Sequence, residues 1–224
     1  MTASLPPDVQ AVFAQFSTTE LITVGEQGQP ISRPVTASYR PGAPCIDVAA
    51  EVAQAAENPL VGLLFCEPSG SGLPDPPMVF VQGSAHVDDE ALHVHPERVY
   101  VWPKGEIATD QELYDAHMEE VRSGHSEEPE RYHADPAGGA TAWSDRLGEL
   151  HTAVLSLISP DGFPFAVRVP VRVDEAARAI KIDGAPTGIP FQPGLACLSA
   201  GELQIRGDLV YAQGAWALVP HEVR

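Results

Sequence analysis

The feature of this sequence that most restricts its fold is a strand–turn–strand pattern that occurs twice. Residues 19–39 alternate apolar and polar side chains on both sides of a glycine-containing turn, which is typical of a β-hairpin. The pattern returns at residues 152–173, with Pro160-Asp161-Gly162 as the turn. In both copies the outgoing strand carries an arginine, a proline and a valine, although the arginine stands one residue further from the turn glycine in the second copy.

Three more pairs of segments repeat in the same order along the chain. They are residues 59–64 and 193–198, residues 81–85 and 205–209, and residues 99–103 and 216–220. One repeated segment can arise by chance in a β-rich chain, whereas four in a single order indicate a duplicated unit of about a hundred residues. We therefore predict two β domains in this chain of 224 residues.

A strongly acidic segment separates the two copies. Residues 106–150 carry many more acidic than basic side chains, and a capping-box spacing that begins at Thr109 predicts a helix there. Over the whole chain, 31 acidic residues outnumber 13 Lys and Arg, for a formal net charge of −18. Binding to a phosphate backbone needs clustered Lys and Arg, so neither nucleic acid nor an anionic membrane is expected as a partner.

Neither a membrane span nor a secretion signal is expected. No window approaches the roughly 18 apolar residues that cross a bilayer, and the N-terminus lacks the charged and apolar regions of a signal peptide. Cys45, Cys66 and Cys197 are scattered without CxxC spacing, which indicates buried thiols in a reducing compartment rather than a disulfide or zinc framework. We therefore expect a cytoplasmic protein.

Three familiar kinds of site are not predicted. His93 and His95 lie two residues apart on a predicted strand and so face one way, with His86 expected nearby, but no carboxylate or cysteine at a fixed spacing completes a metal site. Ser156, His151 and Asp161 are triad residue types without the nucleophile elbow of a hydrolase. The chain contains neither a P-loop nor a dinucleotide-binding GxGxxG motif.

An ordered set of motifs nevertheless resembles one family. Gly-x-Pro at the first hairpin turn, Arg-Pro-Val on its outgoing strand, Asn-Pro before an apolar strand and Gln-Gly-Ser-Ala further on are similar to the pyridoxamine 5′-phosphate oxidase-like flavoproteins. The resemblance covers about residues 5–102 and, in degraded form, residues 152–220. It implies antiparallel split β-barrels, and hence a mainly β chain with two barrel-like repeats.

The resemblance also divides the chain. It implies a first, flavin-binding-like split-barrel domain over residues 1–105, an acidic helical linker over residues 106–150, and a second, degraded split-barrel domain over residues 151–224. Members of the family bind FMN or a deazaflavin, usually at a dimer interface, so the resemblance further implies a small-molecule substrate and a homodimer.

The resemblance points to the outgoing strand of the first hairpin as the cofactor site, because in the family this strand runs along the flavin. The residues implied as cofactor contacts are Arg33, Pro34, Val35, Thr36, Ser38 and Gln82. We expect a flavin against residues 33–38, with the second unit or a partner chain closing the groove. No side chain is assigned as a catalytic acid or base, since a flavin itself supplies the redox chemistry.

One departure from the family leaves two functions open. Residues 49–54 offer no hydroxyl and no cation for the FMN phosphate. Either the phosphate site is lost, or a loop is absent near Ala50, with similar abrupt joins near Leu92 and Ala200. The leading function is an FMN-binding oxidoreductase. The alternative is a non-catalytic split barrel that binds a flavin, haem or another planar ligand, or that serves only in assembly.

Overall fold

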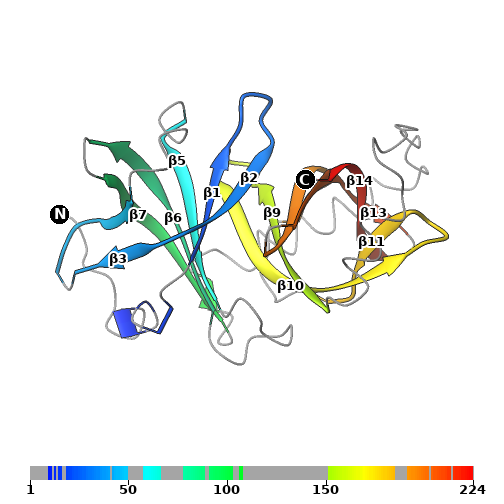
Figure 1. Cartoon of the computed structure of the whole chain (residues 1–224), viewed down its shortest axis with the longest axis horizontal. Helices are drawn as coiled ribbons and strands as arrows, with labels where there is room; N and C mark the ends of the chain where they lie inside the picture. The colour runs from blue at the N-terminus through cyan, green and yellow to red at the C-terminus, as the bar shows by residue number, and fades with distance from the viewer. Residues whose placement is uncertain are drawn as a thin grey trace.

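The computed structural model describes residues 10–11, 13, 15–16, 19–40, 42–49, 58–66, 78–88, 91–102, 106–107, 151–184, 191–201, 203–212 and 214–223. Regular structure in these residues is almost entirely antiparallel β-sheet, arranged as two units (Figure 1). The predicted fold class, a mainly β split barrel with two barrel-like repeats, is confirmed.

The first unit is a curled sheet, and its two edge strands follow each other directly in the sequence. Its strands are β1 (Thr19–Val24), β2 (Pro30–Val35), β3 (Ala37–Tyr39), β4 (Ile46–Ala49), β5 (Leu60–Phe65), β6 (Met78–Val87), β7 (Ala91–Trp102) and β8 (Glu106–Ile107). They are ordered β2-β1-β5-β6-β7-β4-β3, and β8 pairs with β7. Thr36 alone separates β2 from β3, so one nearly continuous strand supplies both ends of this half-barrel.

The second unit is a closed barrel of six strands. They are β9 (Thr152–Ile158), β10 (Pro164–Asp174), β11 (Ala179–Ile182), β12 (Gly194–Ala200), β13 (Leu203–Ala212) and β14 (Ala215–Val223). The order around the barrel is β10-β11-β14-β13-β12-β9, which returns to β10. Closure leaves this sheet without an unpaired edge.

The two units share one topology. In the second unit, β10 takes the place of β2 and β3 together. β9, β11, β12, β13 and β14 take the places of β1, β4, β5, β6 and β7, in that order. Residue pairing fixes the correspondence, because Ala37 pairs with Val48 as Val171 pairs with Ile182. The matching strand order predicted from the repeated segments is therefore present.

Matched β-bulges mark the repeat. Gly83 lies opposite Pro96, and Gly207 lies opposite Pro220, each beside a register shift between its two strands. A Cβ atom on Gly83 would lie 2.1 Å from the carbonyl oxygen of His95, and one on Gly207 would lie 2.0 Å from that of Val219. The partner backbone approaches so closely that only glycine fits.

These pairings correct two of the four sequence matches. Since Pro96 corresponds to Pro220, the predicted match of residues 99–103 with residues 216–220 is wrong. Residues 59–64 correspond to residues 194–199, one position later than predicted. Alternating apolar strands look alike at several registers, so only the pairing of neighbouring strands selects the correct one.

The two units pack through matched strands. β10 contacts β1 and β5, just as β2 contacts β9 and β12. These contacts are reciprocal, so an approximate two-fold axis relates the units, as it would relate the subunits of a symmetric dimer. Residues of β5 and β6 form near-continuous apolar runs because one face of these strands lines the first unit and the other meets the second unit.

The structure describes two of the three abrupt joins expected from the sequence. Leu92 and His93 are consecutive within β7, and Ala200 pairs with Leu203 across a tight turn with Gly201 at a φ of 59°, so no loop is needed at these two joins. The first two residues of the predicted linker, 106 and 107, form β8 in the sheet of the first unit. The join at Ala50, the rest of the linker and its predicted helix lie outside the described residues. No helix in the described part of the chain is long and apolar enough to cross a membrane.

Candidate functional site

A groove of about 390 Å³ opens where the two units meet. Its lining includes three matched pairs of residues, one member from each unit: Glu20 with Val154, Pro34 with Arg168, and Leu64 with Ser199. The groove therefore lies on the approximate two-fold axis, and both units are needed to form it. Its volume falls within the roughly 300–1,000 Å³ of small-molecule sites.

Glu20 places a carboxyl group in this groove. It stands on β1 between Thr19 and Leu21, and its Oε2 accepts a hydrogen bond of 2.6 Å from Ser32 Oγ. Burial raises the pKa of Glu20, although the hydrogen bond from Ser32 and the charge of Arg168 act in the opposite direction. A groove carboxyl whose pKa is raised is suited to holding and transferring a proton.

Arg168 is the cation of the groove. Its Nη1 donates to Thr152 Oγ1 at 3.3 Å, and its backbone N–H donates to Met78 Sδ at 3.4 Å across the junction. The Nε atom of Arg168 is buried and has no hydrogen-bond partner among the described residues. An unsatisfied buried donor costs roughly 1–3 kcal/mol.

The residues predicted to contact a flavin are distributed along β2 and β3. Pro34 lines the groove and is exposed, and Thr36 and Ser38 further along are exposed too. Arg33 and Val35 are half-buried, and Val35 packs against the core of the first unit. Their roles as ligand contacts stay predictions.

The arginines of the two copies occupy different positions, as the offset from the turn glycine predicts. Arg33 pairs with Leu21, whereas Arg168 pairs with Val154 and so corresponds to Pro34. A shift of one position on a strand turns a side chain to the opposite face. The second unit, and not the first, therefore supplies the arginine of the groove.

Gln82 joins the two units. Its side chain is fully buried, its Nε2 donates to the carbonyl oxygen of Pro164 at 3.0 Å, and its Oε1 accepts from Tyr100 Oη at 3.0 Å. Both polar atoms of the amide are thus engaged within the protein. In the structure Gln82 acts as a bridge across the junction.

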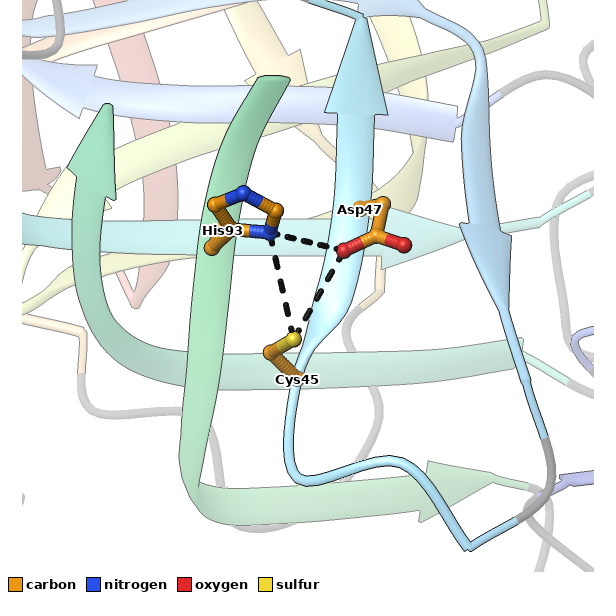
Figure 2. Close-up of side chains that lie close together, drawn as sticks. All are labelled: Cys45, Asp47 and His93. Carbon is orange, nitrogen blue, oxygen red and sulfur yellow. Dashed lines mark hydrogen bonds and ion pairs between the residues drawn. The ribbon is translucent and has the colours of Figure 1, made fainter. Parts of the chain in front are cut away.

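A second group of polar side chains stands on β4 and β7, away from the groove. His93 Nδ1 lies 2.8 Å from Asp47 Oδ1 and 3.9 Å from Cys45 Sγ, and Cys45 Sγ lies 3.6 Å from Asp47 Oδ1 (Figure 2). The other ring nitrogen of His93 lies 2.9 Å from Asp88 Oδ2. We call Cys45, Asp47 and His93 the β4–β7 cluster.

Burial and hydrogen bonds together set the protonation of the β4–β7 cluster. Contacts with Asp88 and then Asp47 raise the pKa of His93. Burial raises the pKa of the Cys45 thiol, and the neighbouring Asp47 carboxylate adds to that effect. The pKa of Asp47 is lowered because its hydrogen bonds with His93 and Cys45 outweigh the effect of burial. The thiol is therefore a protonated donor beside a carboxylate, not an activated nucleophile.

Sequence reasoning found part of these sites. It predicted Pro34 beside a groove, and Pro34 does line one, although its contact with a ligand stays a prediction. It also predicted His86, His93 and His95 close together, and the rings of His86 and His95 stack with centroids 5.1 Å apart. It missed Glu20, although an acid inside an apolar strand is a visible signal. It also missed the proximity of His93 to Cys45 and Asp47, which depends on the pairing of β4 with β7.

Comparisons with known proteins add little. No family model matches the chain, and no curated protein matches it. Among solved structures, the chain is similar to a Clostridium acetobutylicum protein of the pyridoxinephosphate oxidase family, related to general stress protein 26 of B. subtilis. Identity is 12%, the TM-score is 0.35, and the match covers 42% of this chain and 85% of that one. A likeness at this level carries no argument about function.

Proposed function

We propose that this protein binds a flavin, FMN in the first instance, in the groove between its two units and acts as a flavin-dependent oxidoreductase on a small molecule. Two observations support the proposal. The first half carries the ordered motifs of the pyridoxamine 5′-phosphate oxidase-like flavoproteins. Arg168 lines the groove, and its buried Nε donor lacks a partner among the described residues. This unsatisfied donor is the observation that carries the proposal.

The side chains of the groove match the chemistry of a flavin. Its ring needs an apolar wall with hydrogen-bonding groups at the polar edge, and Pro34, Leu64 and Val154 supply apolar surface. Arg168 would donate to a carbonyl or phosphate oxygen of a bound flavin, and the Glu20 carboxyl would lie near its polar atoms. A bound flavin supplies the electron-transfer chemistry. Glu20 holds a proton beside it.

The second candidate is a non-catalytic barrel that holds a flavin, haem or another planar ligand, or that acts only in assembly. One observation favours it. A dianionic phosphate is best bound by several charged donors, and residues 49–54 contain none. Among the described residues lining the groove, Arg168 is the only cation. The two candidates differ in whether a bound flavin can be reduced and reoxidised by a substrate.

A flavin titration tests the proposal. Purified protein is titrated with FMN and, separately, with riboflavin, and binding is followed by flavin absorption and fluorescence. We expect FMN to bind, and Arg168→Gln to weaken binding about 10- to 100-fold through the lost charged hydrogen bond. The matched control is Arg172→Gln, since Arg172 lies on the same strand in an exposed ion pair with Asp183.

The outcomes separate the two candidates. If neither flavin binds, or if both arginine variants weaken binding equally, the groove proposal fails. If FMN binds but cannot be reduced and reoxidised by any small-molecule donor and acceptor pair, the non-catalytic candidate is favoured. Riboflavin binding as tightly as FMN would show that Arg168 holds the ring and not the phosphate.

A further inference from the structure

We propose that the β4–β7 cluster is a binding site for a divalent transition-metal ion, zinc in the first instance, with Cys45 Sγ, Asp47 Oδ1 and His93 Nδ1 as ligands. The site is separate from the groove, and it does not depend on flavin binding. Thiolate, imidazole and carboxylate together suit zinc and its first-row neighbours better than magnesium or calcium, which prefer oxygen ligands alone.

The geometry of the three donor atoms is close to that of a metal site. With metal–ligand distances of about 2.0–2.3 Å, the ligands of a tetrahedral zinc ion lie roughly 3.3–3.6 Å from one another. The observed separations are 3.6 Å from Cys45 to Asp47, 3.9 Å from Cys45 to His93 and 2.8 Å from Asp47 to His93. Movements of about half an ångström by side chains, without a change of backbone, would produce the tetrahedral spacing.

The strands hold the three ligands on one face. Asp47 lies on β4 and Cys45 immediately precedes that strand, and the Sγ of Cys45 lies 3.6 Å from Oδ1 of Asp47. Asp47 pairs directly with His93 on β7, which places the imidazole opposite the carboxylate. All three residues are half-buried, so an ion can reach them from solvent. Three protein ligands leave a fourth position open for water or another small ligand.

The neighbours of the cluster act as outer partners of a metal site. His93 Nε2 lies 2.9 Å from Asp88 Oδ2, the arrangement in which a carboxylate fixes the tautomer and orientation of a metal-binding imidazole. The second oxygen of Asp47, Oδ2, lies 3.3 Å from Arg40 Nη2. The ligand atoms Nδ1 of His93 and Oδ1 of Asp47 thus face each other, while their remaining polar atoms are already engaged.

The second unit supplies an internal comparison. The positions that match Cys45, Asp47 and His93 are Ala179, Lys181 and Ala217. The same fold therefore forms without any of the three donor groups, and Lys181 instead makes a 2.6 Å ion pair with Asp174. Packing of this strand pair therefore does not depend on the cluster.

Cobalt(II) is the probe that tests the site, because a thiolate bound to cobalt gives a charge-transfer absorption band. We expect one equivalent of cobalt to produce this band in the full-length protein, and zinc to displace it. Cys45→Ser is expected to abolish the band, and His93→Gln and Asp47→Asn to weaken zinc binding at least about tenfold. The matched control is His95→Gln, two residues from His93 but outside the ligand triangle, which should bind as the wild type does.

Thiol alkylation gives a second measurement on the wild-type protein and needs no variant to fold. At alkaline pH, where the Cys45 thiol ionises, zinc should protect it from iodoacetamide, whereas the fully buried Cys197 stays unmodified with or without the metal. The proposal is overturned if no charge-transfer band appears, if the band survives in Cys45→Ser, if His95→Gln removes it as well as His93→Gln does, or if zinc leaves the alkylation of Cys45 unchanged.

Discussion

The side-chain amide of Gln82 in the first unit donates a 3.0 Å hydrogen bond to the carbonyl oxygen of Pro164 in the second. The same amide accepts from Tyr100, so one buried residue connects a strand, its neighbour and the other unit. These two hydrogen bonds satisfy both polar atoms of the Gln82 amide. The link between the units is therefore specific as well as apolar.

We expect Gln82→Ala to destabilise the protein by about 2–4 kcal/mol, because it removes a hydrogen bond from the buried carbonyl oxygen of Pro164 and opens a cavity. Chemical denaturation measures the loss. The control is Gln27→Ala in the exposed first turn. A change as small as that of the control would show that the bridge contributes nothing.

Gly83→Ala and Gly207→Ala should each cost about 3 kcal/mol or more, since an added Cβ collides with the backbone of the partner strand. Gly184→Ala is the matched control, because the nearest atom to its Cβ would be 3.9 Å away. Melting temperatures distinguish the variants. Similar stability for all three would contradict the matched bulges.

Glu20→Gln should stabilise the protein at neutral pH. Burial raises the pKa of Glu20 above its ordinary value of 4.5, so the folded state favours the protonated acid. Its contribution is fully present below the unfolded pKa and is lost as pH rises through the higher folded pKa. The difference in unfolding free energy between variant and wild type should therefore grow from pH 4 to pH 7. Glu26→Gln, in the exposed turn, serves as the control. A flat difference would contradict the pKa shift.

Arg33→Ala distinguishes a cofactor contact from a structural ion pair. If Arg33 contacts the flavin, FMN affinity should fall by about 1.5–3 kcal/mol, while the melting temperature of the flavin-free protein stays nearly the same. Calorimetric titration and thermal unfolding together measure both quantities. Equal loss of stability without flavin would assign Arg33 to the fold instead.

The fold was predictable from sequence because its signals are local. The two hairpin turns align residue for residue, with Gly28 and Gly162 both at positive φ and with identical backbone hydrogen bonds around them. The register of later strands was less predictable. A bulge at Gly83 or Gly207 shifts the pairing of its strand, and the alternation of apolar and polar residues in the sequence does not show this shift.

The sites were less predictable than the fold because their members meet through long-range pairing. Pro34 was found from its motif, but Arg168 reaches the same groove only when the two units dock. Cys45 and His93 are far apart in sequence, and the pairing of β4 with β7 brings them together. Residue types alone do not show which residues lie close together in the folded protein.

The approximate two-fold axis through the groove has a consequence for charge. In a true homodimer, each residue beside such an axis faces its own copy, so a glutamate would meet a glutamate and an arginine would meet an arginine. Here Val154 stands at the position that matches Glu20, and Arg168 at the position that matches Pro34. Joining the two copies in one chain has freed them to diverge, so the groove carries one acid, Glu20, and one base, Arg168, where symmetry would give two copies of a single residue. The two sides of such a groove differ in charge, and it can bind a ligand that is itself asymmetric in one orientation only.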